Sequence, residues 1–401
     1  MSLETKEIEP MEMPTTEKSN TETQTKNIDQ KDEPTIVDSY EKKGSLYFTL
    51  NNCDVSIANS IRRIILSEID TVVIKGFPHN ESTIDIKENT TKFNNEIIKQ
   101  RLSCIPIHIK NFDNVDNYVL EIDVENNDGD KMKYIMTSHF KIKDKETEKY
   151  LSDEERNKIF PPNSLTKQHI LFTRLRPKIS EDIFGERLKL TATFAVSNAS
   201  SSNAYNVVST CAYGYSPDKG EQQVQWNKKL SELVDEGNDE EYVQKYKMNW
   251  DNHDAKRITK KNSFDFVIET VGVFTNTELV VKGLQKLKDK FDNIIENVNN
   301  NRYEYKTDTT NMENCIDLHL SDESYTTGKV IEYILYNDYY KEGEIINYIG
   351  FIKKHPHDNY SVLRIVFDSE ENANNDVFGK IVVYACQKAQ KMYSLIQEYF
   401  E

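Results

Sequence analysis

The chain has 401 residues, of which 37% are hydrophobic and 29% are charged, a composition typical of a folded protein with polar segments. Its formal net charge of −16 argues against binding of nucleic acid through the phosphate groups, because such binding needs clustered Lys and Arg. No apolar run is long enough to cross a bilayer, and the first residues lack the apolar stretch of a secretory signal. The cysteines are scattered, so we expect free thiols and no metal or other cofactor.

Residues 1–43 contain almost no large apolar side chains, and we expect them to form a disordered tail. A strand is predicted at 45–50, and Asp54 is the expected N-cap of a helix from Val55 to about Glu68. Helical spacing places one apolar arc on the inner face of this helix: Ile57, Ala58, Ile61, Ile64 and Ile65. Asn59 and Arg63 lie on the opposite side, with Arg62 at the flank.

The sequence pattern changes in the middle of the chain, where strand patterns become frequent. Short strands at 71–74 and 82–86 and a helix at 95–102 precede a stretch, 113–205, that is rich in strand patterns. Within it, Asn126-Asn-Asp-Gly129 predicts a hairpin between strands at 118–124 and 133–137. Further segments are predicted in chain order: strands at 170–175 and 188–196, helices at 226–234 and 240–250, and a strand at 263–269.

One structural plan occurs twice, because each copy begins with a strand, a small-residue turn and an amphipathic helix and ends with a long helix. The two closing helices carry narrow apolar stripes in steps of four and three, which are typical of helices that pack against each other. The stripes are Val280, Leu284, Leu287, Phe291, Ile294 and Val298 in the first copy, and Phe378, Val382, Ala385, Ala389, Met392, Ile396 and Tyr399 in the second. We expect these helices to pair within one chain, although pairing with other chains is the alternative.

The predicted fold is therefore α+β, an intramolecular pseudo-dimer of two sheet-plus-helix halves with a β-rich insertion in the first. The expected layout is a disordered tail (1–43), a first dimerisation half (44–112 and 206–298), an insertion domain (113–205), a linker (299–314) and a second dimerisation half (315–401).

The stretch Cys53-Asp-Val-Ser-Ile-Ala-Asn-Ser-Ile-Arg-Arg63 resembles the ANsiRR signature of the α-like RNA polymerase assembly subunits. This family includes the bacterial α subunit, the archaeal D subunit and the third subunit of eukaryotic polymerases. Asn95-Glu-Ile-Ile-Lys-Gln-Arg101-Leu-Ser-Cys-Ile-Pro-Ile107 and Phe264-Asp-Phe-Val-Ile-Glu-Thr-Val-Gly272 are similar to two further segments of that family, with Asn95 in place of its Asp.

The second copy resembles the smaller partner of that subunit, which is the archaeal L or eukaryotic eleventh subunit. Gly350-Phe-Ile-Lys-Lys-His-Pro356 and Leu363-Arg-Ile365 are similar to its GY-HPl element and the strand that follows. Tyr325-Thr-Thr-Gly-Lys329 is a degraded form of its HTLGN turn. The chain departs from the larger subunit at Ser202–Val208, where little of the family's GkeHAKwsPv motif is left, and it lacks the metal-binding cysteines that many members carry in the insertion.

The resemblance implies a non-catalytic assembly subunit of a DNA-dependent RNA polymerase, whose partners are the largest and second-largest subunits and small polymerase subunits. It implies docking roles for Asn59, Arg62, Arg63 and Arg101. Both halves in one chain resemble the fused subunit of large cytoplasmic DNA viruses, which implies the host cytoplasm and the virion; a cellular protein would act in the nucleus. No membrane, no homo-oligomer and only indirect contact with nucleic acid are expected.

Two other functions fit parts of the sequence. A scaffold with the same fold could act outside a polymerase. A metal-dependent hydrolase would use His355 and His357 with Asp358 or His319 as further ligands. The adjacent proline and the absence of a third ligand that converges on them in sequence favour a turn. Taken alone, the Arg62–Arg63 pair would more often be a solvated helix face.

Overall fold

The computed structural model describes residues 33–127, 131–180, 182–307, 312–343 and 345–401. Most of the expected disordered tail, residues 1–32, lies outside the described part. Residues Thr35–Lys42, however, form a strand, β1, so the tail prediction is wrong for this segment. Ile36 explains the difference, because it is 9% exposed and packs in the main hydrophobic core. Within the described ranges, no helix is long and apolar enough to span a membrane.

The N-terminal sheet is antiparallel and has the order β1-β2-β12-β11. Its remaining strands are β2 (Ser45–Asn51), β11 (Val208–Pro217) and β12 (Thr259–Thr270). Side chains alternate along β2, so that Leu46, Phe48 and Leu50 are all buried. Two helices contribute to the same core as this face, α1 (Val55–Ser67) and α6 (Asn276–Asn299).

The C-terminal sheet follows the same plan and has the order β13-β14-β16-β15. Its strands are β13 (Glu304–Lys306), β14 (Cys315–Ser321), β15 (Ile346–Ile352) and β16 (Tyr360–Phe367). Its helices are α7 (Tyr325–Leu335), which continues into a π-helical turn at Tyr336–Tyr340, and α8 (Asn375–Gln397). β13 falls inside the segment 299–314 that was expected to be a linker, and it pairs with β14.

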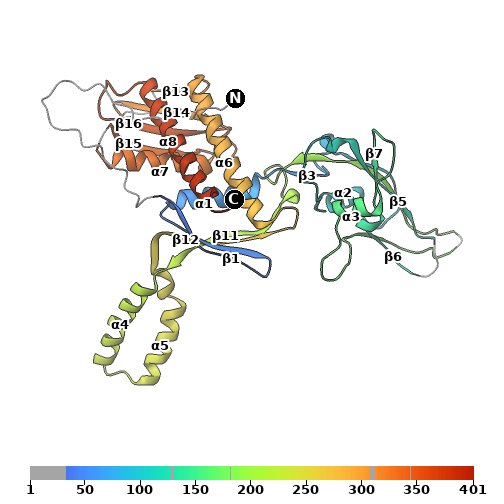
Figure 1. The fold of residues 1–401 in the computed structure, drawn as a ribbon, viewed down its shortest axis with the longest axis horizontal. Helices are drawn as coiled ribbons and strands as arrows, with labels where there is room; N and C mark the ends of the chain where they lie inside the picture. The colour runs from blue at the N-terminus through green and yellow to red at the C-terminus, as the bar shows by residue number, and fades with distance from the viewer. Residues whose placement is uncertain (1–32, 128–130, 181, 308–311, 344) are drawn as a thin grey trace. The chain divides into compact units, whose positions relative to one another are not determined.

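The two long helices, α6 and α8, pack against each other (Figure 1). All six stripe residues of α6 are buried, and so are Phe378, Val382, Ala385, Ala389 and Ile396 of α8. Met392 is only partly buried, and Tyr399 is 54% exposed because α8 ends at Gln397. The stripe prediction is therefore wrong at Tyr399. Tyr393, which the spacing missed, is fully buried instead: its ring stacks on Phe291 with centroids 5.9 Å apart, and its hydroxyl lies 2.7 Å from Ser60 Oγ.

A second hydrophobic core belongs to the middle of the chain. Its sheet has the order β4-β9-β5-β7, beside a two-stranded ribbon of β6 and β8 and a short β3–β10 pair. The strands are β3 (Thr71–Val73), β4 (Ile84–Asn89), β5 (Tyr118–Glu125), β6 (Lys133–Met136), β7 (Lys141–Asp144), β8 (Leu171–Leu175), β9 (Arg187–Thr193) and β10 (Ala195–Ser197). The predicted β5–β6 hairpin is wrong: β5 pairs with β7 and β9, whereas β6 pairs with β8. Asp128 and Gly129 of the predicted turn lie outside the described residues.

This second core begins earlier than the predicted insertion. It includes Val72, Ile84 and Ile98, all of which precede residue 113. The helices α2 (Asn95–Ser103) and α3 (Asp153–Ile159) contribute Ile98 and Ile159 to it. Strand β4 pairs with β9, and this pairing brings a segment assigned to the first half into the sheet of the insertion.

Two helices form a separate pair between β11 and β12, α4 (Lys219–Asp235) and α5 (Glu240–Asn252), as the sequence predicts. They meet through Trp226 and Trp250, whose ring centroids lie 6.1 Å apart, and Lys247 Nζ lies 4.3 Å from the Trp226 ring centroid. An ammonium group over an indole ring adds a favourable cation–π interaction.

Replacing Leu287 with Ala tests the contact between α6 and α8. Leu287 is fully buried, so the variant should lose about 2–5 kcal/mol of unfolding free energy. Denaturant titration of the full chain measures the loss. Gln285→Ala is the matched control, because Gln285 is exposed on the same helix and should change the unfolding free energy by less than about 0.5 kcal/mol. Equal effects of the two substitutions would contradict the packing described here.

Candidate protein-docking site

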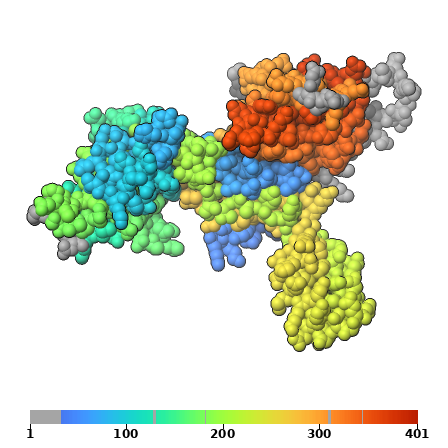
Figure 2. All heavy atoms as spheres, turned by 180° about the vertical axis from the view of Figure 1, so that it is seen from behind, coloured from blue at the N-terminus to red at the C-terminus, as the bar shows by residue number. Residues whose placement is uncertain are grey.

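Helix α1 lies where the two sheet-and-helix layers meet, because it packs against α6, α7 and β11. Asp54 begins the helix, as predicted: its Oδ1 accepts a hydrogen bond of 2.8 Å from the backbone N–H of Ser56. Gly283 lets α6 approach closely, since a Cβ atom there would lie 2.7 Å from Ile65 Cγ1. Figure 2 shows the blue early segment in contact with the orange-to-red C-terminal part of the chain.

Asn59 and Arg62 form one rigid pair on the outer side of α1. The Arg62 side chain donates to Asn59 Oδ1 from Nε at 3.1 Å and from Nη2 at 2.9 Å. Both residues are half-buried. A guanidinium group held at one edge by an amide has a fixed orientation and can present its remaining donors to a partner's carboxylate or carbonyl groups.

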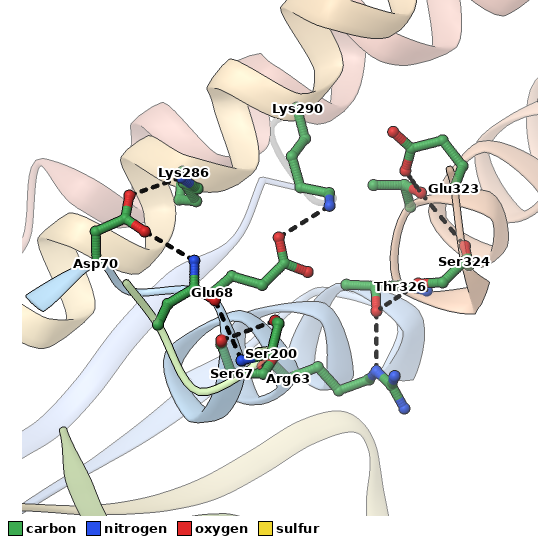
Figure 3. Close-up of polar contacts among 12 residues, drawn as sticks. Arg63, Ser67, Glu68, Asp70, Ser200, Lys286, Lys290, Glu323, Ser324 and Thr326 are labelled. Atoms are coloured by element: carbon green, nitrogen blue, oxygen red, sulfur yellow. Dashed lines mark hydrogen bonds and ion pairs between the residues drawn. The ribbon is translucent and has the colours of Figure 1, made fainter. Parts of the chain in front are cut away.

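Arg63 is exposed but is tied to the second layer. Its Nε donates a hydrogen bond of 2.9 Å to Oγ1 of Thr326, a buried residue in the first turn of α7 (Figure 3). Among the described residues, the two terminal nitrogens of Arg63 have no hydrogen-bond partner. The sequence motif placed Arg63 on the outer face of α1, but it did not reveal that the side chain bridges both layers.

A polar strip runs beside this bridge and was missed by the sequence reading. It consists of two ion pairs between α6 and the end of α1, Lys290–Glu68 at 2.9 Å and Lys286–Asp70 at 3.0 Å, together with Glu323 before α7 (Figure 3). The paired groups are only partly buried, so each pair contributes modestly to stability. The two ion pairs join the C-terminal end of α1 to α6.

Glu323 is the buried acid of the polar strip. It is 8% exposed, and Thr327 Oγ1 donates a 2.6 Å hydrogen bond to its Oε2. Burial raises the pKa of the Glu323 carboxyl, and this effect outweighs the attraction of Lys290 and the Thr327 hydrogen bond.

The structure does not bring Arg101 together with the three α1 residues. Arg101 lies on α2 and is exposed, and its Nε and Nη2 donate to the carbonyl oxygens of Phe172 and Leu171 at 2.6 and 3.3 Å. Within the described strands, β8 pairs with β6 alone, so its other edge needs hydrogen-bond donors. Arg101 meets part of that need, and its docking role stays a prediction.

The histidines considered as metal ligands lie in a tight turn. The backbone N–H of His355 donates to Asp358 Oδ2 at 3.0 Å, and that of His357 donates to His355 Nδ1 at 3.2 Å. His319, which was also considered, stacks on the Tyr360 ring with centroids 4.7 Å apart. Across the described ranges, no three His, Cys, Asp or Glu side chains are grouped to hold a metal ion.

Glu323→Gln tests the buried acid. A raised pKa means that the folded state binds the proton more tightly than the unfolded state, so its stabilising contribution is complete at low pH and is lost as the pH rises through the folded-state pKa. The Gln variant keeps an acceptor for Thr327 and carries no charge. We expect its unfolding free energy, relative to the original chain, to increase between pH 4 and pH 7. Glu241→Gln, on the exposed face of α5, should show no such trend, and a trend in the opposite direction would contradict the assignment.

Comparisons with known proteins identify relatives of this chain. A family model described as the RNA polymerase Rpb3/Rpb11 dimerisation domain matches residues 47–291, more than half of the chain. The RPB3 subunit of RNA polymerase II from Schizosaccharomyces pombe is 37% identical over 71 residues, which are 18% of this chain and 22% of that protein. The RPAC1 subunit of RNA polymerases I and III from Saccharomyces cerevisiae is 24% identical over 288 residues, covering 61% of this chain and 81% of the relative.

A conjugation stage-specific protein from Tetrahymena thermophila is 44% identical over 72 residues, 18% of this chain and 21% of that protein. In the shorter matches the chain thus spans about a fifth of the relative's length. The predicted resemblance to α-like polymerase subunits is confirmed by these matches. The chain belongs to the RNA polymerase Rpb3/Rpb11 dimerisation domain family.

Proposed function

We propose that this chain is a non-catalytic assembly subunit of a multisubunit DNA-dependent RNA polymerase and that it docks the two large catalytic subunits. The observation that carries the proposal is the outer face of α1. There Asn59, Arg62 and Arg63 are ordered by hydrogen bonds, while the apolar face of the same helix is buried between the two layers. The polymerase subunits matched by the sequence support the same role.

The proposal includes an intramolecular pseudo-dimer. Two antiparallel four-stranded sheets with their own helices share one hydrophobic core, and α6 and α8 are their contact. The approach is close, since a Cβ atom at Gly379 of α8 would lie 3.2 Å from Val298 Cγ1 of α6. The family model covers the first layer and ends at residue 291, so the assignment of the second layer rests on its matching plan.

A single chain gives the pairing a physical advantage. A short linker keeps each half close to the binding surface of the other, at an effective concentration on the order of millimolar. Pairing therefore no longer depends on how much of each half is made. The fused arrangement supports a viral polymerase that acts in the host cytoplasm and is carried in the virion. Separate halves would be the arrangement of the cellular, nuclear enzyme.

Docking is proposed to involve α1 and not α2. The Asn59–Arg62 pair and the terminal nitrogens of Arg63 face outward, whereas the Arg101 guanidinium bonds to the backbone of β8. Small polymerase subunits remain further proposed partners.

Arg63→Ala tests the docking proposal. Loss of a charge-assisted hydrogen bond costs about 1.5–3 kcal/mol, so binding of the large subunits should weaken roughly 10- to 100-fold. The measurement is co-purification of the tagged full chain with the two large subunits of its polymerase, followed by an affinity titration. Arg63→Lys should restore little, because an ammonium group lacks the planar fork.

Arg302→Ala is the control for that experiment, since Arg302 is an exposed arginine far along the chain that pairs only with Glu296 and Asn297 among the described residues. Thermal unfolding of each variant shows whether the chain stays folded. If Arg63→Ala binds as tightly as the control, α1 is not the docking surface. If the original chain recovers no large subunit, the assembly role itself is wrong.

A further inference from the structure

A hydrogen bond crosses between the two layers inside their shared core. It joins Ser60 Oγ of α1 to the hydroxyl of Tyr393 on α8 at 2.7 Å. Ser60 is 1% exposed and Tyr393 is fully buried, and the Tyr393 ring stacks on Phe291 of α6. A hydroxyl group buried this deeply in an apolar core has to find its hydrogen-bond partner within the protein.

The donor and the acceptor of this bond can be assigned. A serine hydroxyl carries one proton, and Ser60 donates its proton to the carbonyl oxygen of Ile57 at 2.7 Å. Ser60 Oγ is therefore the acceptor in the bond between the layers, and the Tyr393 hydroxyl is the donor. Burial raises the pKa of the Tyr393 phenol, so this hydroxyl keeps its proton at neutral pH. Among the described residues, Tyr393 has no other hydrogen-bond acceptor.

The two residues depend on each other unequally. If the Tyr393 hydroxyl were absent, the Ser60 hydroxyl would still donate to Ile57. If the Ser60 hydroxyl were absent, Tyr393 would be a buried donor without an acceptor. Leaving one buried partner unsatisfied costs more than removing both partners together. A tyrosine at position 393 is thus favourable only where the facing helix supplies an acceptor.

The second layer has no acceptor at the matching position. Counted from the N-cap residue of each helix, the position of Ser60 in α1 is that of Val330 in α7. Counted in the same way in the long helices, the position of Tyr393 in α8 is that of Ile294 in α6. Val330 and Ile294 are both fully buried and apolar. At these matching positions, the second layer therefore carries the donor and the first layer carries the acceptor.

We propose that Ser60 and Tyr393 make the pairing of the layers selective, so that α8 is accepted by a first layer and disfavoured by the second layer of another copy. This inference rests on the intramolecular pseudo-dimer of the proposed function. In a pair of two second layers, each Tyr393 hydroxyl would face a valine, and two buried donors would lack an acceptor. A pair of two first layers is not affected, because Ser60 keeps its bond to Ile57.

Full chains with the four combinations at positions 60 and 393 test this selectivity. They are the original chain, Ser60→Ala, Tyr393→Phe and the double variant, and alanine stands for a layer without an acceptor. Hydrogen exchange of the backbone amides of α1 and α8 measures how often the core between the layers opens. Exchange should be about 2- to 10-fold faster in Tyr393→Phe and about 5- to 100-fold faster in Ser60→Ala.

The double variant decides the inference. Its α1 and α8 amides should exchange more slowly than those of Ser60→Ala alone, because no buried donor is left without a partner. The chain would thus prefer tyrosine when position 60 is serine and phenylalanine when it is alanine. A residue that only fills space would not show this reversal, since a second truncation would enlarge the cavity. If Ser60→Ala leaves the layers open, restored protection in the double variant still gives the answer.

Matched controls are available on the same elements. Ser67→Ala removes a hydroxyl that also donates to a carbonyl oxygen of α1, that of Arg63, and Tyr399→Phe changes a tyrosine that is 54% exposed just beyond α8. Neither should change the exchange rates by more than about 2-fold. Amides of β5, which belongs to the second core, are the internal reference and should exchange equally in all variants.

The outcomes separate this inference from the assembly role. If Tyr393→Phe does not slow exchange in the Ser60→Ala chain, the pair is not selective and the inference is overturned, even if the chain recovers the large subunits. If the reversal is observed but the chain recovers no large subunit, the pairing inference stands and the assembly role is wrong.

Discussion

Packing of α6 against α8 is the contact on which the functional geometry depends. The facing residues are apolar and fully or almost fully buried, from Val280 to Val298 on one helix and from Phe378 to Ile396 on the other, apart from Met392. Each such side chain contributes about 1.5–3 kcal/mol of gross burial energy. Small residues at Gly283 and Gly379 allow the close approach of α1 to α6 and of α8 to α6. Without this contact, the apolar stripes of α6 and α8 would be exposed to water.

Helix α1 takes its position from that contact. Its apolar face lies on α6, its N-terminal half borders β11 and α7, and Arg63 reaches Thr326 in the opposite layer. The ion pairs Lys290–Glu68 and Lys286–Asp70 orient the helix more than they stabilise it, because both pairs are partly exposed to solvent. The same crossing holds the proposed docking face of α1, so the proposal requires that a partner bind a chain whose two layers have already met.

Local sequence patterns predicted much of the arrangement of α1 and α6. The spacing of Ile57, Ile61 and Ile64 and the cap at Asp54 predicted α1, and the stripe on α6 predicted its buried face. What the patterns could not supply was pairing between distant segments. The turn signal at Asn126-Asn-Asp-Gly129 predicted a hairpin between β5 and β6, but β5 pairs with β7 and with β9, which lies far along the chain. Tyr393 was missed because the predicted stripe took a step of three from Ala389 to Met392. The buried face continues by a step of four to Tyr393, whose hydroxyl pairs with Ser60.

The predicted docking residues also fall into two groups, those on α1 and Arg101 on α2. The motif identified Asn59, Arg62 and Arg63 as a group, and they share α1. Arg101 came from a second motif, and its exposed side chain bonds to the backbone of β8. No sequence spacing could have shown that Arg63 reaches Thr326, since the two residues are more than 250 positions apart along the chain.

Separating the two layers into two chains tests the central claim most directly. Residues 1–307 and 312–401 would be co-expressed with a tag on one of them and purified through it. If α6 and α8 join the layers, the untagged piece co-purifies in a 1:1 complex, and Leu287→Ala weakens that complex. Recovery of the tagged piece alone, folded and stable without the other, would contradict the account.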